Sequence, residues 1–200
     1  MLPLLLASAS PRRREMLERV GVPLEVRPAD VDEEPLADED PAAYVARIAH
    51  AKAHAVKRRP GQWVLAADTT VTIGGKILAK AADGEEAAAM LRQLAGRVHQ
   101  VITAFTILGD ADDTVFHRDG IIASDVVVIE LDEARIADYV ATGEWRGKAG
   151  AYAIQGIGAA LVREVRGSVT NVIGLPLVEV LEALRAVGAP SAKFAAGTPS

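Results

Sequence analysis

The most constraining feature of the sequence is the apolar run from Leu2 to Ala7, which leads directly into the polar stretch 8–11. A continuous apolar run of this length is typical of a strand that is covered on both faces of its sheet. Ser10 is a good helix cap, Pro11 suits the first helical position, and Gly21 is placed to end the helix. We therefore expect a strand, a short loop and a helix at the start of the chain.

The same run superficially resembles a signal peptide with a small-residue cleavage site. It lacks a basic segment and its apolar stretch is very short, so a buried strand is the better interpretation. No apolar run approaches the roughly 18 to 20 residues that a membrane-spanning helix needs. The sequence has no cysteine, which excludes disulfides and cysteine nucleophiles and fits a reducing compartment. We expect a cytoplasmic protein without a membrane partner.

The remaining sequence interleaves helical and strand patterns over 200 residues, half of them apolar. This pattern favours one α/β domain, residues 1–188, with a mixed central sheet flanked by helices. The stretch 189–200, rich in Pro, Ala, Ser and Gly, is expected to fray. After the first helix we expect an acidic loop at 30–40, helices at 41–59, 83–96, 132–143 and 176–187, strands at 63–67, 97–108, 121–131 and 159–165, a turn at 109–113, and a Gly-rich loop at 144–158.

The start of the first helix carries three arginines, at positions 12, 13 and 14. Cations there oppose the helix dipole at roughly 0.3–1 kcal/mol each, and a bound phosphate chain would reverse that effect. The planar arginine fork also suits phosphate oxygens. The alternative is a solvated basic helix start that is simply tolerated. The net charge of −5 argues against a general nucleic-acid binder but permits a small anionic substrate.

Two further charged residues stand where apolar ones are expected. Lys52 falls on the apolar stripe of the second helix, so it either points into a cleft or extends its ammonium to water. Asp68 follows an apolar strand, although the β-branched run to Ile73 also looks like strand. Ligands of α/β sheets gather at the carboxyl ends of strands, where a carboxylate can hold Mg²⁺ or position water. The alternative for Asp68 is a cap or turn residue.

Other residues are weaker candidates when each is taken alone. Lys80 fits an ordinary surface lysine. Asp32, Glu33 and Glu34 lie in an acidic loop that is expected to be solvated, but one of them could share a metal with Asp68. Lys148 and Gln155 lie in the Gly-rich loop, where glycines permit close approach of a ligand and the glutamine amide can read a base edge. The alternative is an ordinary flexible loop.

The four histidines show no convincing metal pattern. His50 and His54 lie one helical turn apart, but no H-E-x-x-H motif accompanies them. Together with His99 and His117, they are interpreted as surface or helix residues.

Three stretches taken together resemble the Maf proteins, which are nucleoside triphosphate pyrophosphatases with a fold related to the inosine triphosphate pyrophosphatases. The resemblance runs from Leu4 to Leu184 and implies two lobes around a cleft. A proline usually follows the hairpin lysine in this family, whereas this chain has Ala81 after Lys80. The three stretches are LLLASASPRRREML at 4–17, LAADTTV at 65–71, and KAGAYAIQGIGAALV at 148–162 followed by NVIGLPL at 171–177.

The resemblance also assigns roles to residues. It makes Asp68 the catalytic base and places a divalent metal, Mg²⁺ or alternatively Mn²⁺, on Glu33 and Asp68. It implies a preference for dTTP and UTP, set by Arg12, Thr69 and Gln155. The residues that it implies for binding the substrate are Ser8, Arg12, Arg13, Lys52, Lys80 and Lys148.

The reaction implied is hydrolysis of a nucleoside triphosphate to the monophosphate and pyrophosphate, which cleans the nucleotide pool. Because Maf proteins are also linked to inhibition of septum formation, a nucleotide-binding regulator of cell division is the alternative function. The resemblance further implies a homodimer, for which the sequence shows no interface.

Overall fold

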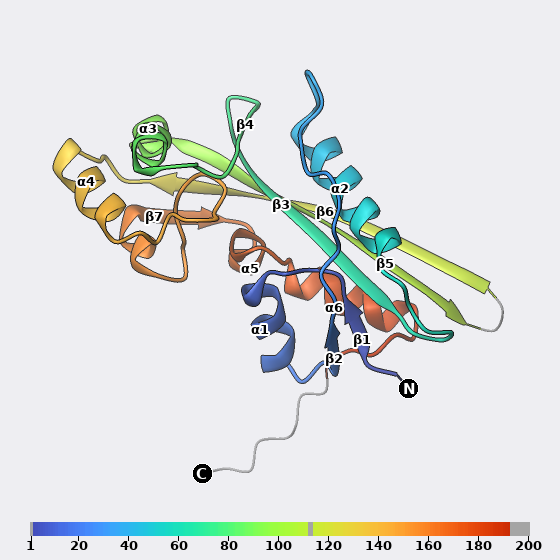
Figure 1. Ribbon diagram of the computed structural model, residues 1–200. Helices are drawn as coiled ribbons and strands as arrows, with labels where there is room; N and C mark the ends of the chain where they lie inside the picture. The colour runs from blue at the N-terminus through green and yellow to red at the C-terminus, as the bar shows by residue number, and fades with distance from the viewer. Residues whose placement is uncertain (1, 112–113, 193–200) are drawn as a thin grey trace, which may run out of the picture.

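The computed structural model describes residues 2–111 and 114–192. They form a mixed α/β fold in which a seven-stranded sheet carries helices on both faces, which confirms the expected class (Figure 1). In chain order the elements are β1 (Leu4–Leu6), α1 (Pro11–Arg19), β2 (Leu24–Val26), α2 (Pro41–Ala55), β3 (Val64–Ile73), β4 (Lys76–Leu78), α3 (Gly84–Leu94), β5 (Val98–Ala111), β6 (Thr114–Val128), α4 (Glu133–Ala141), the 3₁₀ helix η1 (Ile157–Leu161), β7 (Val162–Arg166), α5 (Val169–Ile173) and α6 (Leu177–Ala186).

The sheet runs in the order β2-β1-β3-β5-β6-β7, and β4 pairs with β3 off this path. Strand β1 is parallel to β2 and β3, while the other pairs are antiparallel. On one side β3 pairs with β5 from Val64 to Thr72. On its other side β1 meets only Val64 and Leu65, and β4 meets only residues 71–73. An unpaired stretch of the β3 edge is therefore left between β1 and β4.

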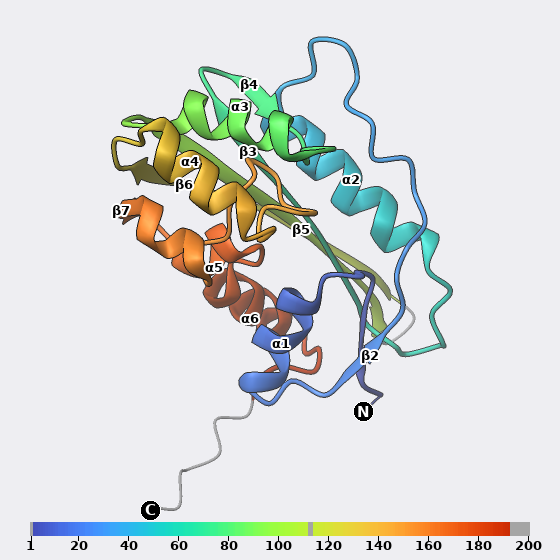
Figure 2. The same cartoon turned by 60° about the vertical axis from the view of Figure 1, so that its left-hand side comes forward.

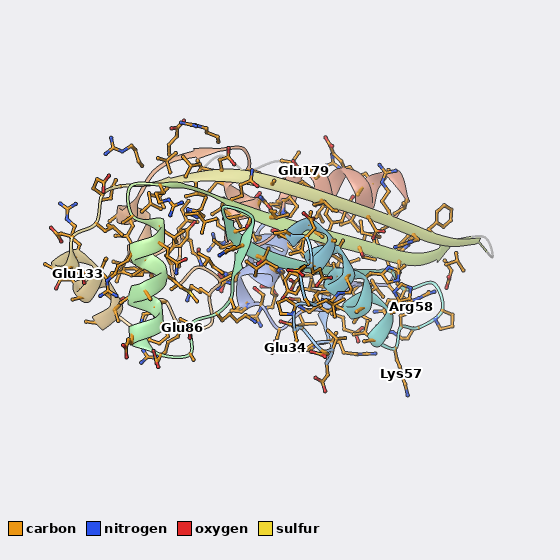
Figure 3. All side chains as sticks on the ribbon, turned by 90° about the horizontal axis from the view of Figure 1, so that it is seen from above. Glu34, Lys57, Arg58, Glu86, Glu133 and Glu179 are labelled. Atoms are coloured by element: carbon orange, nitrogen blue, oxygen red, sulfur yellow. The ribbon has the colours of Figure 1, made fainter. Side chains whose placement is uncertain are left out.

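Alternation along the strands separates four apolar clusters. Helix α2 covers one face with two of them, and in one of these Val45 and Ala49 pack on Ile102 and Ala104. The other face carries two large clusters, one built with α1 and α6 and the other with α3 and α4. Figure 3 shows α2 and α6, the helix that carries Glu179, on opposite sides of the sheet. The two large clusters form the cores of two lobes, as expected.

The helices begin within one residue of the starts predicted from the sequence. Ser10, Asp40, Asp83 and Asp132 each accept a hydrogen bond from a backbone N–H of the first turn. Short polar side chains satisfy donors that the helix itself leaves unpaired, which is why these signals are reliable. The end of α2 is less well predicted, since the helix stops at Ala55 rather than near residue 59.

The strand predictions are wrong in length. Strand β3 does not end at residue 67, because its pairing with β5 continues to Thr72. Gly109 was expected in a turn but lies within β5, where a Cβ would come within 2.1 Å of the Trp63 ring. This glycine makes room for an aromatic ring instead of turning the chain. The predicted turn also includes residues 112 and 113, which lie outside the described residues.

Several short elements differ from the prediction or are absent from it. The strand expected at 159–165 begins only at Val162, because residues 157–161 form η1. Strand β2 and helix α5 were not predicted, since a three-residue strand and a five-residue helix give little periodicity.

At the end of the chain, Ala189 is buried against the cluster that contains α6. The packed part of the chain therefore reaches at least to this residue, whereas residues 193–200 of the expected tail lie outside the described part. No helix within the described ranges has the length and apolar character needed to cross a membrane.

His99, expected at the surface or on a helix, is instead buried in β5 and only 2% exposed. Its Nε2 atom lies 2.8 Å from the Tyr152 hydroxyl. Burial lowers the pKa of His99 to about 4, against a smaller opposing effect of the Asp125 charge. The neutral ring is thus part of the folded core.

Protonation of His99 is expected to make stability depend on pH. Since the folded pKa of His99 lies below its ordinary value, the unfolded chain binds the extra proton first as the pH falls. Its contribution is complete above about pH 6.5 and is lost between there and pH 4, by up to about 3 kcal/mol.

Urea unfolding of the wild type and of His99→Gln across this pH range tests this expectation. Subtracting the variant's free energy of unfolding from that of the wild type at each pH removes the common effect of the carboxylates. The free energy of unfolding should change less steeply with pH in the variant. An equal pH dependence of the free energy of unfolding in both proteins would contradict a lowered pKa of His99.

Candidate active site

A cleft of about 330 Å³ lies between the two lobes, within the usual size range of small-molecule sites. Its walls come from the β1–α1 loop and α5 on one side and from the loop before η1 on the other, with β3 between them. Every site residue predicted from the sequence lines it: Ser8, Arg12, Arg13, Glu33, Lys52, Asp68, Thr69, Lys80, Lys148 and Gln155.

The unpaired edge of β3 determines where this cleft forms. The carbonyls of Trp63 and Leu65 accept hydrogen bonds from the N–H groups of Leu5 and Ala7, both at 2.8 Å. The chain then turns away from the sheet, and the next carbonyl in the row, that of Ala67, accepts from Arg13 Nη1 at 2.8 Å. The arginine side chain thus takes the place of the next strand residue.

Arg13 joins four segments of the chain. Its other hydrogen bonds run from Nε to the Gly174 carbonyl at 2.7 Å, from Nη1 to Ser8 Oγ at 3.1 Å, and from Nη2 to Thr69 Oγ1 at 2.9 Å. With the bond to Ala67, four of the five guanidinium N–H groups are in use. Arg13 is only 7% exposed and its pKa is lowered, chiefly by burial, although an arginine stays charged. The geometry makes Arg13 chiefly a clamp, and among the described residues its fifth N–H group has no partner and can bind a ligand.

A chain of alternating charges crosses the cleft. Lys52 Nζ lies 2.7 Å from Asp68 Oδ1 and 2.6 Å from Glu33 Oε1, and Lys80 Nζ lies 3.4 Å from Glu33 Oε2. Lys52 and Asp68 are each only 7% exposed. Lys52 therefore points into the cleft, and the alternative that its ammonium reaches outward to water is wrong.

Asp68 lies in the middle of β3, so the alternative of a cap or turn residue is also wrong. Strand β1 ends opposite Leu65, three residues before Asp68, so Asp68 lies beyond the carboxyl end of β1. Because successive side chains alternate between faces, Asp68 meets Lys52 on the α2 side. Thr69 points to the other side, where its hydroxyl lies 2.8 Å from that of Thr103.

Glu33 and Asp68 form a donor set that fits a hard divalent cation. Their oxygens converge on one point, the Lys52 ammonium. Carboxylate oxygens are the ligands that Mg²⁺ and Mn²⁺ prefer. Burial acts to raise the pKa of Glu33, but the hydrogen bond and charge of Lys52, aided by Lys80, outweigh it and hold the pKa below its ordinary value.

Tyr44 belongs to the same region but was missed from the sequence. Its hydroxyl donates to the Glu33 carbonyl at 2.9 Å and so fixes the acidic loop on α2. Burial, together with the charges of Asp68 and Glu33, raises the pKa of Tyr44 to about 12. The available signal was spacing, since Tyr44 lies eight residues before Lys52 on the same helical face.

The opposite wall presents a lysine and a glutamine. Lys148 Nζ donates to the carbonyl of Glu144 at 2.6 Å. Burial and the charge of Arg12 lower the pKa of Lys148, while Glu144 acts in the opposite direction. Arg12 is half-buried and donates from Nε to the Ile173 carbonyl at 3.2 Å. Gln155 is exposed at the rim.

Glu144 holds this wall in shape and was also missed from the sequence. Its carboxylate accepts hydrogen bonds from the N–H groups of Ile157 and Gly158 at 2.9 and 2.8 Å and from the Tyr139 hydroxyl at 2.8 Å. No motif signals this role, because the acceptor lies thirteen or more residues from both N–H donors.

Comparisons with known proteins cover nearly the whole chain. A family model described as "Maf-like protein" matches residues 3–187. A "dTTP/UTP pyrophosphatase" of Anaeromyxobacter dehalogenans strain 2CP-1 is 51% identical over 187 residues, 94% of this chain and 95% of that protein. One of Myxococcus xanthus strain DK1622 is 47% identical over 188 residues, 94% of this chain and 93% of that protein. A solved structure, the Staphylococcus aureus Ham1 protein, aligns with a TM-score of 0.41 at 16% identity, over 63% of this chain and 72% of that chain.

Arg13→Met is expected to destabilise the fold strongly. The change leaves the buried Ala67 carbonyl without its donor, at about 1–3 kcal/mol. It also removes a charged donor, worth about 1.5–3 kcal/mol, from the Gly174 carbonyl, which keeps a bond of 3.3 Å from the Thr69 hydroxyl. Arg14→Met is the matched control, because Arg14 is half exposed and its side chain pairs with Glu18 at 3.7 Å. Urea unfolding should show a loss of about 3 kcal/mol or more for Arg13→Met and less than about 0.5 kcal/mol for the control. Similar losses in both variants would rule out the clamp.

Proposed function

The chain belongs to the Maf-like family, and we propose that it hydrolyses nucleoside triphosphates, above all dTTP and UTP, to the monophosphate and pyrophosphate. The observation that carries the proposal is the buried Asp68–Lys52 pair at the floor of a cleft ringed by cations. The curated relatives named dTTP/UTP pyrophosphatase support both the reaction and the substrates.

The triphosphate binds between the two lobes. Arg12 and Lys148 face the cleft from opposite walls, and the charge of Arg12 already lowers the pKa of Lys148. An anionic chain between them removes this repulsion. The start of α1 adds backbone N–H groups that favour phosphate. Ser8 Oγ accepts from Ser10 N and Arg13 Nη1, so its own proton is left to donate to a phosphate oxygen.

Asp68 acts on the attacking water. Its Oδ1 atom is held by Lys52, while its Oδ2 atom makes no hydrogen bond within the described part of the chain. This free oxygen orients water toward the α-phosphorus and accepts its proton. Lys52 and Lys80 lie where they stabilise the charge that develops on the leaving pyrophosphate.

A divalent cation, Mg²⁺ or Mn²⁺, completes this site when it is held by Glu33 and Asp68. The bound cation would neutralise negative charge on the phosphate oxygens of the substrate. Lys80 and Tyr44 then serve to keep Glu33 and its loop in place.

Gln155, at the rim of the cleft, selects the nucleobase of the substrate. A uracil or thymine edge presents an N–H donor beside a carbonyl acceptor, and the Gln155 amide offers the complementary pair. Thr69 and Arg12 lie deeper and set the position of the nucleotide relative to that rim. Thr69 is itself fixed by Arg13 and Thr103, so it offers a rigid wall.

Asp68→Asn should abolish most of the turnover while leaving substrate binding. Removing a general base lowers kcat about 10²- to 10⁴-fold. Asp138→Asn makes the same chemical change on the exposed face of α4 and should have no effect. The measurement is pyrophosphate release from dTTP and UTP with Mg²⁺. Wild-type turnover in Asp68→Asn would show that Asp68 is not the general base.

A further inference from the structure

A second group of ionisable side chains lies outside the cleft, where α2 runs alongside the β5–β6 hairpin (Figure 2). Ligand atoms of His50, His117 and Asp119 all lie within 4.8 Å of one another. His50 comes from α2 and the other two residues from β6. The group therefore connects a helix and a strand that are far apart in the sequence.

The geometry of both elements brings these residues together. Positions 117 and 119 lie on the same face of β6, and positions 50 and 54 lie one turn apart on α2. The ring centroids of His50 and His117 are 5.2 Å apart, and the His54 ring lies 4.1 Å from that of His50. Three imidazoles and one carboxylate thus converge at the surface, although the sequence showed no metal pattern among these histidines.

Two contacts already orient potential ligands in this group. His54 Nδ1 lies 2.9 Å from the His50 carbonyl oxygen, which can only accept. His54 therefore donates from Nδ1, and in the neutral ring the Nε2 lone pair stays free. Asp119 Oδ1 accepts from Thr106 Oγ1 at 2.6 Å. Hydrogen bonds of this kind hold imidazole and carboxylate ligands in metal sites.

We infer that His50, His117 and Asp119 form a binding site for a transition-metal ion of the Zn²⁺ class, with His54 beside it. Imidazole nitrogen favours Zn²⁺, Cu²⁺ or Ni²⁺ over Mg²⁺, so this site differs in kind from the carboxylates of the cleft. Three protein ligands leave a fourth position for water. The ion ties α2 to β6, and α2 is the helix that holds Lys52 in the cleft.

The distances are compatible with such an ion after small rotations. Tetrahedral ligands at 2.0–2.1 Å from Zn²⁺ lie about 3.4 Å apart, so separations that are within 4.8 Å must shrink by at most about 1.4 Å. All three side chains are exposed to solvent. The His117–Asp119 contact, 3.0 Å from Nε2 to Oδ2, gives way to ligation.

Titration of the purified full-length chain with Zn²⁺ against a chromophoric chelator tests the inference. We expect one ion per chain in a Glu33→Gln/Asp68→Asn background, which removes the carboxylates of the cleft. Free Zn²⁺ at about 100 times its Kd should also lower the unfolding equilibrium constant about 100-fold.

His50→Gln and His117→Gln should each weaken Zn²⁺ binding at least about 10-fold, and Mg²⁺-supported hydrolysis should stay unchanged in both. Arg118→Ala is the matched control, since it lies between two ligands but on the opposite face of β6. Absence of Zn²⁺ binding in the double variant, or equal binding in both histidine variants and the control, would overturn the inference. Both results are independent of whether the cleft hydrolyses nucleotides.

Discussion

The hydrogen bond from Arg13 to the Ala67 carbonyl is the contact on which the rest of the site depends. A strand edge that ends its pairing leaves backbone groups that must find partners. Here β1 departs after Leu6, and one buried guanidinium satisfies the next position of the ladder. Because the same side chain also holds Gly174 and Thr69, the gap in the sheet is fixed as a cleft and does not close.

The chemistry of the cleft follows from alternation along β3 beside that gap. One position turns Asp68 toward Lys52 on α2, and the next turns Thr69 toward Arg13. Two proposed functions therefore fall on adjacent residues. The proposed catalytic acid lies on one face of the sheet, and the wall of the proposed nucleotide pocket lies on the other. The two lobes then contribute cations from opposite sides, which suits a ligand with several negative charges.

Local signals predicted much of this arrangement. Ser10 and Pro11 mark the start of α1 because capping is a short-range interaction, and Lys52 was conspicuous as a charge on an apolar stripe. The clamp made by Arg13 was not predictable, because its backbone partners lie 54 and 161 residues away. Gly109 misled the prediction for a related reason, since the ring that it accommodates belongs to Trp63, which lies 46 residues earlier and directly precedes β3. The family resemblance supplied the roles that no local pattern could.

In the proposed mechanism, Asp68 directs water to the α-phosphorus of a nucleotide held across the open edge of β3. Hydrolysis of dTTP in ¹⁸O-labelled water with Mg²⁺, followed by mass spectrometry of both products, shows which phosphorus the water attacks. We expect one labelled oxygen in the nucleoside monophosphate and none in the pyrophosphate. Label in the pyrophosphate, or release of orthophosphate as the first product, would contradict it.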